Sequence, residues 1–125
     1  MTDDEAKTVC NQIRQIAYDL HVYLGTGYLE KVYENGLSHR LENAGMKVLR
    51  QVPIKVQDED GFVIGEYIAD MVVNGIVVEL KTVATLLPVH VAQVINYLKA
   101  MKLEHGMLIN FGAETFQCKT LAKRR

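Results

Sequence analysis

The chain has 125 residues, of which 49% are hydrophobic and 23% charged, a composition typical of one globular domain. Its net charge is −1, with 14 Lys and Arg against 15 Asp and Glu, which excludes a tight, non-specific DNA binder that depends on overall charge. Two cysteines are too few for a disulfide framework. The acidic N-terminus lacks a signal-peptide pattern, and no apolar run reaches the roughly 20 residues that span a bilayer, so we expect a cytoplasmic protein without a membrane segment.

Two helices are predicted at the start of the chain. Residues 3–24 carry apolar side chains at helical spacing, and Asp3 or Asp4 would serve as the N-cap. A second apolar stripe extends over residues 28–44. It ends at Gly45, because glycine readily takes the left-handed conformation found at helix C-termini.

The middle of the chain has the pattern of β-strands. Residues 48–56 and 62–73 are strand-like, and Pro53 indicates that the first of them lies at an edge of the sheet, because proline cannot donate a ladder hydrogen bond. Asn74-Gly75 is the strongest short-range hairpin signal. Residues 76–81 are therefore predicted to form the return strand.

The helical period returns after Pro88 and predicts a helix that ends near His105. Residues 107–111 predict a short buried strand, and residues 115–119 predict a last one. The basic stretch at residues 119–125 is expected to be a solvated tail. The order of helix, helix, three strands, helix, strand and strand describes a mixed α/β domain.

The Asn74-Gly75 turn predicts which residues of the hairpin face each other. In a two-residue hairpin Asp70 lies opposite Glu79, and Lys81 shares their face because side chains alternate along a strand. Opposed carboxylates are unfavourable in a sheet, and apolar neighbours add to the cost unless a cation neutralises them. Two interpretations follow, which are an ordinary salt bridge on a solvent-facing sheet and a divalent-metal site.

Oxygen ligands of this type suit Mg²⁺ or Mn²⁺. Asp70 and Glu79 would hold the metal, with the backbone carbonyl of Leu80 as a further ligand. A metal there would polarise a phosphoryl oxygen and acidify bound water. Lys81 would orient or deprotonate that water, or stabilise the developing negative charge.

The same residues carry a resemblance to a known family. Asp70 followed by Val78-Glu79-Leu80-Lys81 resembles the D…(D/E)-x-K signature of the PD-(D/E)XK nuclease superfamily, and the wider sequence resembles its small GxxExxY branch. The motifs that carry this second likeness are Gly27-Tyr28-Leu29-Glu30-Lys31-Val32-Tyr33, Val52-Pro53, Leu87-Pro88-Val89-His90, Ala92-Gln93, Asn96-Tyr97-Leu98-Lys99 and Leu108-Ile109-Asn110-Phe111-Gly112.

The resemblance implies a restriction-endonuclease-like fold, with an α-β-β-β-α-β core, a mixed sheet flanked by helices, and one nuclease-like domain over residues 1–125. It also implies that Glu30 reaches the metal site as a further acidic group, although spacing alone favours a solvated helix residue. Gln93 is a candidate contact for substrate phosphate or a metal-bound water, and Tyr97, one helical turn later, is otherwise a core aromatic. His21 and His90 are candidates to line the cleft, against the commoner structural role of a lone histidine.

The expected function is that of a Mg²⁺- or Mn²⁺-dependent nuclease, with DNA as the favoured substrate. A catalytically silent module that retains the fold and binds nucleic acid or a protein is the first alternative. A scaffold with a salt-bridge network and a hydrolase of small phosphodiesters are further alternatives. The oligomeric state stays open, and a homodimer is one option because nucleases of this type often dimerise to cut both strands.

Overall fold

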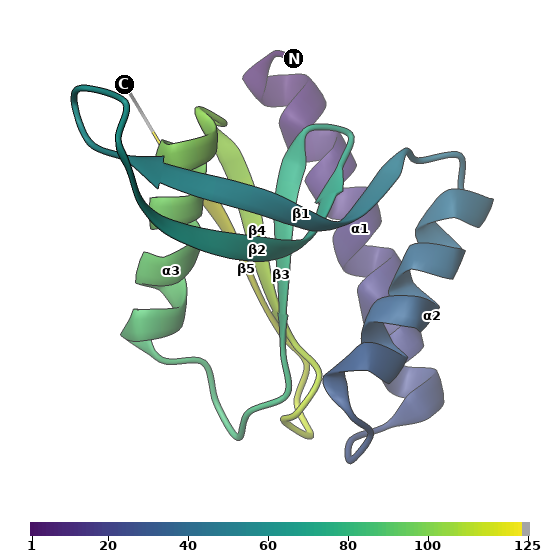
Figure 1. Ribbon diagram of the computed structural model, residues 1–125. Coiled ribbons are helices and arrows are strands. Elements are labelled where there is room, and N and C mark those ends of the chain that lie inside the picture. The colour runs from purple at the N-terminus through teal and green to yellow at the C-terminus, as the bar shows by residue number, and fades with distance from the viewer. Residues whose placement is uncertain (124–125) are drawn as a thin grey trace.

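The computed structural model describes residues 1–123, which form three helices and five strands (Figure 1). In chain order the elements are α1 (Asp3–Leu24), α2 (Glu30–Asn43), β1 (Val48–Gln57), β2 (Val63–Val73), β3 (Ile76–Lys81), α3 (Pro88–Met101), β4 (His105–Asn110) and β5 (Gln117–Ala122). This is the predicted order, and the last strand is present. None of the helices in residues 1–123 is long and apolar enough to cross a membrane.

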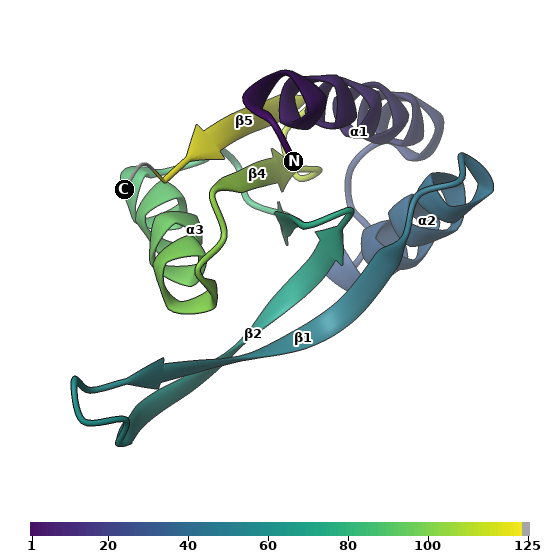
Figure 2. The same cartoon turned by 90° about the horizontal axis from the view of Figure 1, so that it is seen from above.

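The five strands form one mixed sheet in the order β1-β2-β3-β4-β5. Neighbouring strands are antiparallel except β3 and β4, which are parallel and are joined by α3 as a crossover helix. Helices α1 and α2 pack on one face of the sheet and α3 packs on the other (Figure 2). The predicted mixed sheet flanked by helices is confirmed, and Pro53 lies on the edge strand β1 as expected.

Two hydrophobic cores result from this layering. The larger core joins α1 and α2 to one face of the sheet, and its fully buried members include Tyr33, Leu37 and Phe111. The smaller core joins α3 to the opposite face through Val94 and Leu98. Burial on both faces explains why β3 is a nearly continuous run of buried apolar residues.

The predicted N-cap of α1 is wrong by one or two residues. Thr2, not Asp3 or Asp4, caps the helix, since its Oγ1 accepts a hydrogen bond from the Glu5 backbone at 3.1 Å. The Glu5 side chain accepts the Thr2 backbone N–H in return, and this reciprocal pair is a capping box. The two aspartates instead lie in the first turn, where negative charge is favourable.

Other boundaries also differ from the prediction, and β4, for example, is His105–Asn110 where residues 107–111 were expected. Helix α2 begins at Glu30 rather than at residue 28, because Leu29 has an extended backbone. Helix α3 ends at Met101 rather than near His105, because Lys102 takes the left-handed conformation. Strand β5 begins and ends later than predicted, so the expected tail starts with a strand residue, Lys119, paired with Leu108. The tail's last two positions lie outside the described residues.

The β1–β2 hairpin extends past the body of the molecule. Strands β1 and β2 are 10 and 11 residues long, and their distal part, residues 55–67, forms a two-stranded arm (Figures 1 and 2). The proximal part of the same hairpin lies in the sheet beside β3 and carries Asp70. One hairpin therefore carries both Asp70 and the arm that projects from the molecule.

Candidate active site

The hairpin register predicted from the Asn74-Gly75 turn is present from Val73↔Ile76 to Met71↔Val78. At the next position the backbone N–H groups bond to side-chain oxygens instead of to backbone carbonyls. Glu79 Oε1 accepts the Asp70 backbone N–H at 2.6 Å, and Asp70 Oδ2 accepts the Leu80 backbone N–H at 2.8 Å. The two carboxylates are neighbours as predicted, but each bonds to the opposite strand's backbone rather than simply standing across the ladder.

The ladder is also interrupted on the other side of Asp70. Arg50 pairs with Met71 and Val52 pairs with Ala69 in the same register, while Gln51 between them has a φ of 51° and does not pair with Asp70. Its side chain bonds to Glu34 Oε1 at 2.6 Å. Asp70 therefore lies at a gap in both ladders, where its carboxylate is not confined to strand pairing.

Helix α2 brings two glutamates to this gap. Glu30, in its first turn, is near enough to Asp70 that each carboxyl group changes the pKa of the other. Glu34, one turn later, is buried and accepts bonds from Arg50 at 2.6 Å and Lys31 at 3.2 Å. Burial opposes ionisation of Glu34, but these cations outweigh it and lower its pKa. Glu34 is therefore an ionised anchor of α2 on β1, and Glu30 is the residue that faces the site.

Lys81 is held by α3. Its Nζ donates to Gln93 Oε1 at 2.9 Å, and Gln93 also hydrogen-bonds the Tyr97 hydroxyl. Tyr97 is 5% exposed, and burial together with the nearby Glu79 and Asp70 raises its pKa to about 12. The predicted contact residues Gln93 and Tyr97 are thus next to the catalytic candidates, and Tyr97 is also a core aromatic.

The carboxyl groups make ionisation costly for one another. Glu79 is 4% exposed, and burial followed by repulsion from Asp70 raises its pKa to about 8. Burial is also the main cause that raises the pKa of Asp70 and of Glu30. A divalent cation bound between these carboxyl groups would offset their mutual repulsion. The donor set, all carboxylate oxygens, fits a hard cation such as Mg²⁺ or Mn²⁺.

The two histidines have other partners. His21 is buried, its Nε2 lies 2.8 Å from the Ala113 carbonyl oxygen, and its ring packs near Phe111 and Phe116. His90 accepts the Leu87 backbone N–H on Nδ1 at 3.0 Å and so caps the start of α3. These contacts account for His21 in the core, while His90 lies at the end of α3 that follows the β3 loop.

Asn110 is a residue whose role the sequence did not reveal. It is fully buried, and its side chain bonds Val83 N at 3.0 Å, Val83 O at 2.9 Å and Gly112 N at 2.9 Å. The Phe111 backbone N–H also bonds the Lys81 carbonyl at 2.8 Å. The loop after Lys81 is therefore fixed to the end of β4. The sequence feature that marks this residue is the Leu108-Ile109-Asn110-Phe111-Gly112 motif, which does not by itself indicate the contact.

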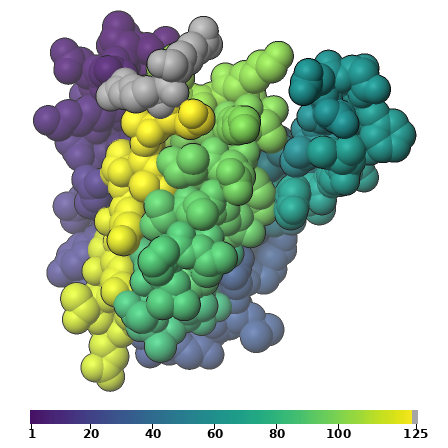
Figure 3. Space-filling view, turned by 90° about the vertical axis from the view of Figure 1, so that its left-hand side faces the viewer, coloured from purple at the N-terminus to yellow at the C-terminus, as the bar shows by residue number. Residues whose placement is uncertain are grey.

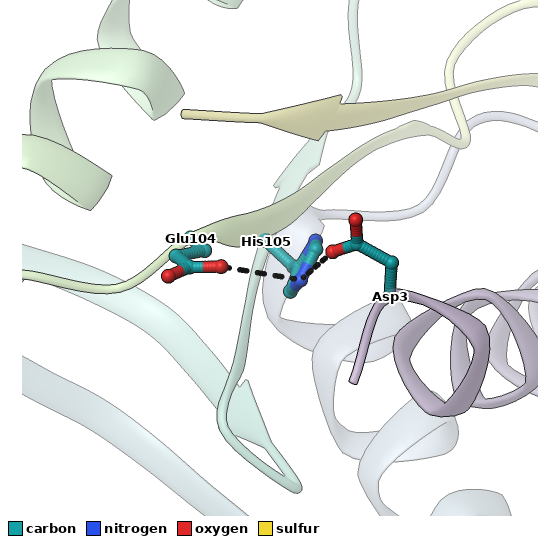
Figure 4. A group of neighbouring side chains, drawn as sticks. All are labelled: Asp3, Glu104 and His105. Atoms are coloured by element: carbon teal, nitrogen blue, oxygen red, sulfur yellow. Dashed lines mark ion pairs between the residues drawn. The ribbon is translucent and has the colours of Figure 1, made fainter. Parts of the chain in front are cut away.

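A second group of possible ligands lies elsewhere (Figure 4). His105 Nε2 lies 3.5 Å from an Asp3 oxygen and 3.9 Å from a Glu104 oxygen. His105 begins β4, and since β3 and β4 are parallel, this cluster lies at the opposite end of the sheet from Lys81. It joins the start of α1 to β4 and does not contribute to the candidate active site.

Comparison with known proteins identifies the fold and the superfamily. No curated protein matches the chain. The structure is similar to the crystal structure of a protein named SSO0001, with a TM-score of 0.61 and 19% sequence identity over 93% of this chain and 63% of that one. At this identity the likeness shows the fold, which is restriction-endonuclease-like. A sequence profile described as the PD-(D/E)XK nuclease superfamily matches residues 7–124, so the chain belongs to that superfamily.

Proposed function

We propose that the protein is a metal-dependent nuclease that hydrolyses phosphodiester bonds, with Mg²⁺ or Mn²⁺ as its cofactor and DNA as its substrate. The observation that carries the proposal is the pairing of Asp70 and Glu79, each of which accepts a backbone N–H from the other's strand, on a hairpin that also carries Lys81. Glu30, at the start of α2, is near enough to contribute to the raised pKa of Glu79. A solvent-facing salt bridge does not account for a glutamate that is 4% exposed among like charges.

Each residue has a distinct role in this proposal. Asp70, Glu79 and Glu30 hold the cation, and Asp70 and Glu79 are oriented because one oxygen of each is bonded to backbone. In an extended strand the N–H and C=O of one residue point to the same side, so the Leu80 carbonyl is directed toward Asp70 and is available as a further ligand. A bound divalent cation polarises the phosphoryl oxygen and acidifies a bound water.

Lys81 acts on the attacking water or on the charge that develops in the transition state. Its ammonium is oriented by Gln93, whose Oε1 accepts a hydrogen bond from Lys81 Nζ. Lys81 therefore steadies a hydroxide or phosphorane oxygen beside the cation. Gln93 acts through Lys81, so it is a positioning residue in this scheme.

We also place the chain in the GxxExxY branch of the superfamily. The three positions that name this motif have separate tasks here. Gly27 has a φ of 105°, Glu30 reaches Asp70, and the Tyr33 hydroxyl donates to the Gly25 carbonyl at 2.6 Å. Tyr33 also stacks on Phe111, with ring centroids 4.7 Å apart. The motif thus supplies the turn, the ligand and the anchor that together direct the start of α2 to the site.

Isothermal titration with Mn²⁺ tests the site before any substrate is known. We expect the wild type to bind Mn²⁺ and Asp70→Asn to lose this binding, while Asp19→Asn, an exposed carboxylate on α1, keeps it. A panel of single-stranded and duplex DNA and RNA then tests cleavage, with Lys81→Met expected to bind Mn²⁺ but not cleave. Cleavage by Asp70→Asn at the wild-type rate would remove the proposal. Metal binding with no cleavage of any substrate would identify a catalytically silent module.

A further inference from the structure

We propose that the groove between the arm and α3 holds a single-stranded segment of the nucleic acid and leads it to the catalytic carboxylates, an inference that rests on the proposed nuclease function. The groove has a volume of about 750 Å³. One wall is the arm, through residues 55–58 and Tyr67, and the other is the outer face of α3. In Figure 3 the tip of the arm stands apart from α3 at the upper right of the molecule.

The groove lies next to the candidate active site, because two of its lining residues adjoin the site. Gln93 lines the groove, and its Oε1 accepts from Lys81 Nζ at 2.9 Å. Tyr97 lines it as well, and its hydroxyl lies within the electrostatic influence of Glu79 and Asp70. A polymer strand in the groove therefore meets Gln93 and Tyr97 before it meets the carboxylates.

The charge of the groove suits a phosphate backbone. Lys99 and Lys102 line its α3 wall, both are exposed, and neither has an ion-pair partner among residues 1–123. Lys55 lines the arm wall but stands across the ladder from Glu66. Asp58, at the far end of the arm wall, is the acidic lining residue. The positive charge of the groove is therefore concentrated on its α3 wall. It would attract phosphates that the acidic site alone repels.

An exposed aromatic ring faces this charge. Tyr67 is 53% exposed, and its ring centroid lies 5.7 Å from that of the buried Tyr97 at an interplanar angle of 45°. The buried ring supports the exposed one and leaves it available to a base. Aromatic side chains beside a basic track are the means by which proteins hold unpaired bases.

The size of the groove selects one strand. Its volume lies within the roughly 300–1,000 Å³ of sites that hold one small ligand. Such a groove accepts a short stretch of a single strand, whereas a duplex is wider than its own major groove of about 12 Å and one turn of it far exceeds this volume. The expected substrate class is thus nucleic acid with an unpaired segment.

Fluorescence anisotropy tests the groove without cleavage. Asp70→Asn, checked for folding by circular dichroism, is titrated with a labelled single-stranded oligonucleotide and with the same sequence closed into a duplex hairpin. We expect tighter binding of the single strand. If Asp70→Asn does not fold, the wild type in EDTA takes its place. Equal or tighter binding of the duplex, or no binding of either, would overturn the inference.

The lysines and the tyrosine have matched controls on the opposite side of the sheet. In the binding assay Lys99→Gln/Lys102→Gln should lower the slope of log affinity against log salt by about 1.4, at about 0.7 per lost phosphate contact, while Lys7→Gln/Lys47→Gln should not. Tyr67→Ala should weaken single-strand binding roughly 5- to 150-fold, the range for one base–aromatic stack, and Tyr23→Ala should leave it unchanged. If the groove variants bind single strands as tightly as the control variants do, the groove does not take part in binding.

Failure of the groove and failure of the nuclease proposal give different results. Mn²⁺ titration of Lys99→Gln/Lys102→Gln should match the wild type, since neither lysine contacts the carboxylates. If the protein binds Mn²⁺ and cleaves duplex, and these substitutions do not change its affinity for nucleic acid, the nuclease proposal stands and the groove inference is wrong. A protein that does not bind Mn²⁺ loses the nuclease function, whatever its affinity for single strands.

Discussion

At the scale of single residues, the candidate site consists of a few carboxyl groups whose negative charges a bound cation would neutralise. The proximity of Asp70 and Glu79 could be predicted from the sequence because a two-residue turn determines the positions on both strands next to it. Glu30 could not be placed by spacing, since its proximity to Asp70 depends on how α2 packs against the sheet. The gap at Gln51, which frees Asp70 from the ladder, is a tertiary feature with no sequence signal.

The raised pKa of Glu79 predicts an unusual dependence of stability on pH in metal-free protein. The folded-state pKa is about 8 and the ordinary value is 4.5, so Glu79 stabilises the fold fully below pH 4.5 and loses this contribution as the pH rises through 8. Urea unfolding at several pH values between 5 and 9 should show the decline. Glu79→Gln should flatten it, whereas a wild-type curve that is already flat over this interval would contradict the prediction.

Gln93 is expected to affect catalysis more than metal binding. Gln93→Ala removes the acceptor that orients the Lys81 ammonium, and loss of such a supporting partner typically costs about 10- to 100-fold in activity. Steady-state kinetics should show the loss in kcat, with Mn²⁺ affinity near that of the wild type. Gln93→Glu, which keeps an acceptor oxygen, serves as the partial rescue. An unchanged kcat in Gln93→Ala would mean that Lys81 is oriented by other contacts.

At the scale of elements, patterns that repeat along the chain were predictable and single-residue stops were not. The apolar period located α1, and the turn located β2 and β3. The end of α3 depends on the left-handed Lys102, which is neither glycine nor asparagine and so gave no signal. The packing of the loop after β3 against the end of β4, through Asn110, joins segments far apart in sequence.

Gly112 tests that loop contact. A Cβ at this position would lie 2.5 Å from Val83 N and 2.6 Å from Val83 O, so the backbone after Lys81 would have to move. We expect Gly112→Ala to lower the free energy of unfolding by about 1–3 kcal/mol, as overpacking does, and to reduce kcat. Gly65→Ala is the control, because its Cβ meets only Tyr67 Cε2 at 3.9 Å. Equal thermal midpoints for the two variants would show that the loop adapts freely.

At the scale of the whole molecule, the fold brings the site together from three parts that are separate in the chain, which are the start of α2, the β2–β3 hairpin and α3. The order of elements could be predicted, because period and turn chemistry are local, and the mixed sheet was implied by the family resemblance. The arm and the groove beside α3 could not, because hydrophobic patterning describes faces of elements rather than the spaces between them. The groove could therefore be identified only from the structure.

A cation that bridges these parts should stabilise the whole domain. At a free Mn²⁺ concentration 100 times the dissociation constant, binding to the folded state alone adds about 2.7 kcal/mol to the free energy of unfolding. Thermal unfolding of the wild type should shift upward with Mn²⁺, and that of Asp70→Asn should not. A shift of the same size in both proteins would indicate that Mn²⁺ binds elsewhere, with the Asp3, Glu104 and His105 cluster as the first place to examine.

The parallel pairing of β3 with β4 has a consequence for the order of folding. Asp70 and Glu79 are nine residues apart and meet through a hairpin, which is a contact that chains close within microseconds. Lys81 reaches its partner Gln93 only when α3 has crossed over the sheet so that β4 can pair with β3, and Glu30 arrives only when α2 docks. Half of the candidate active site thus forms early and locally, and the other half forms only with the complete domain, so the proposed nuclease activity requires α3 and β4 to be in place.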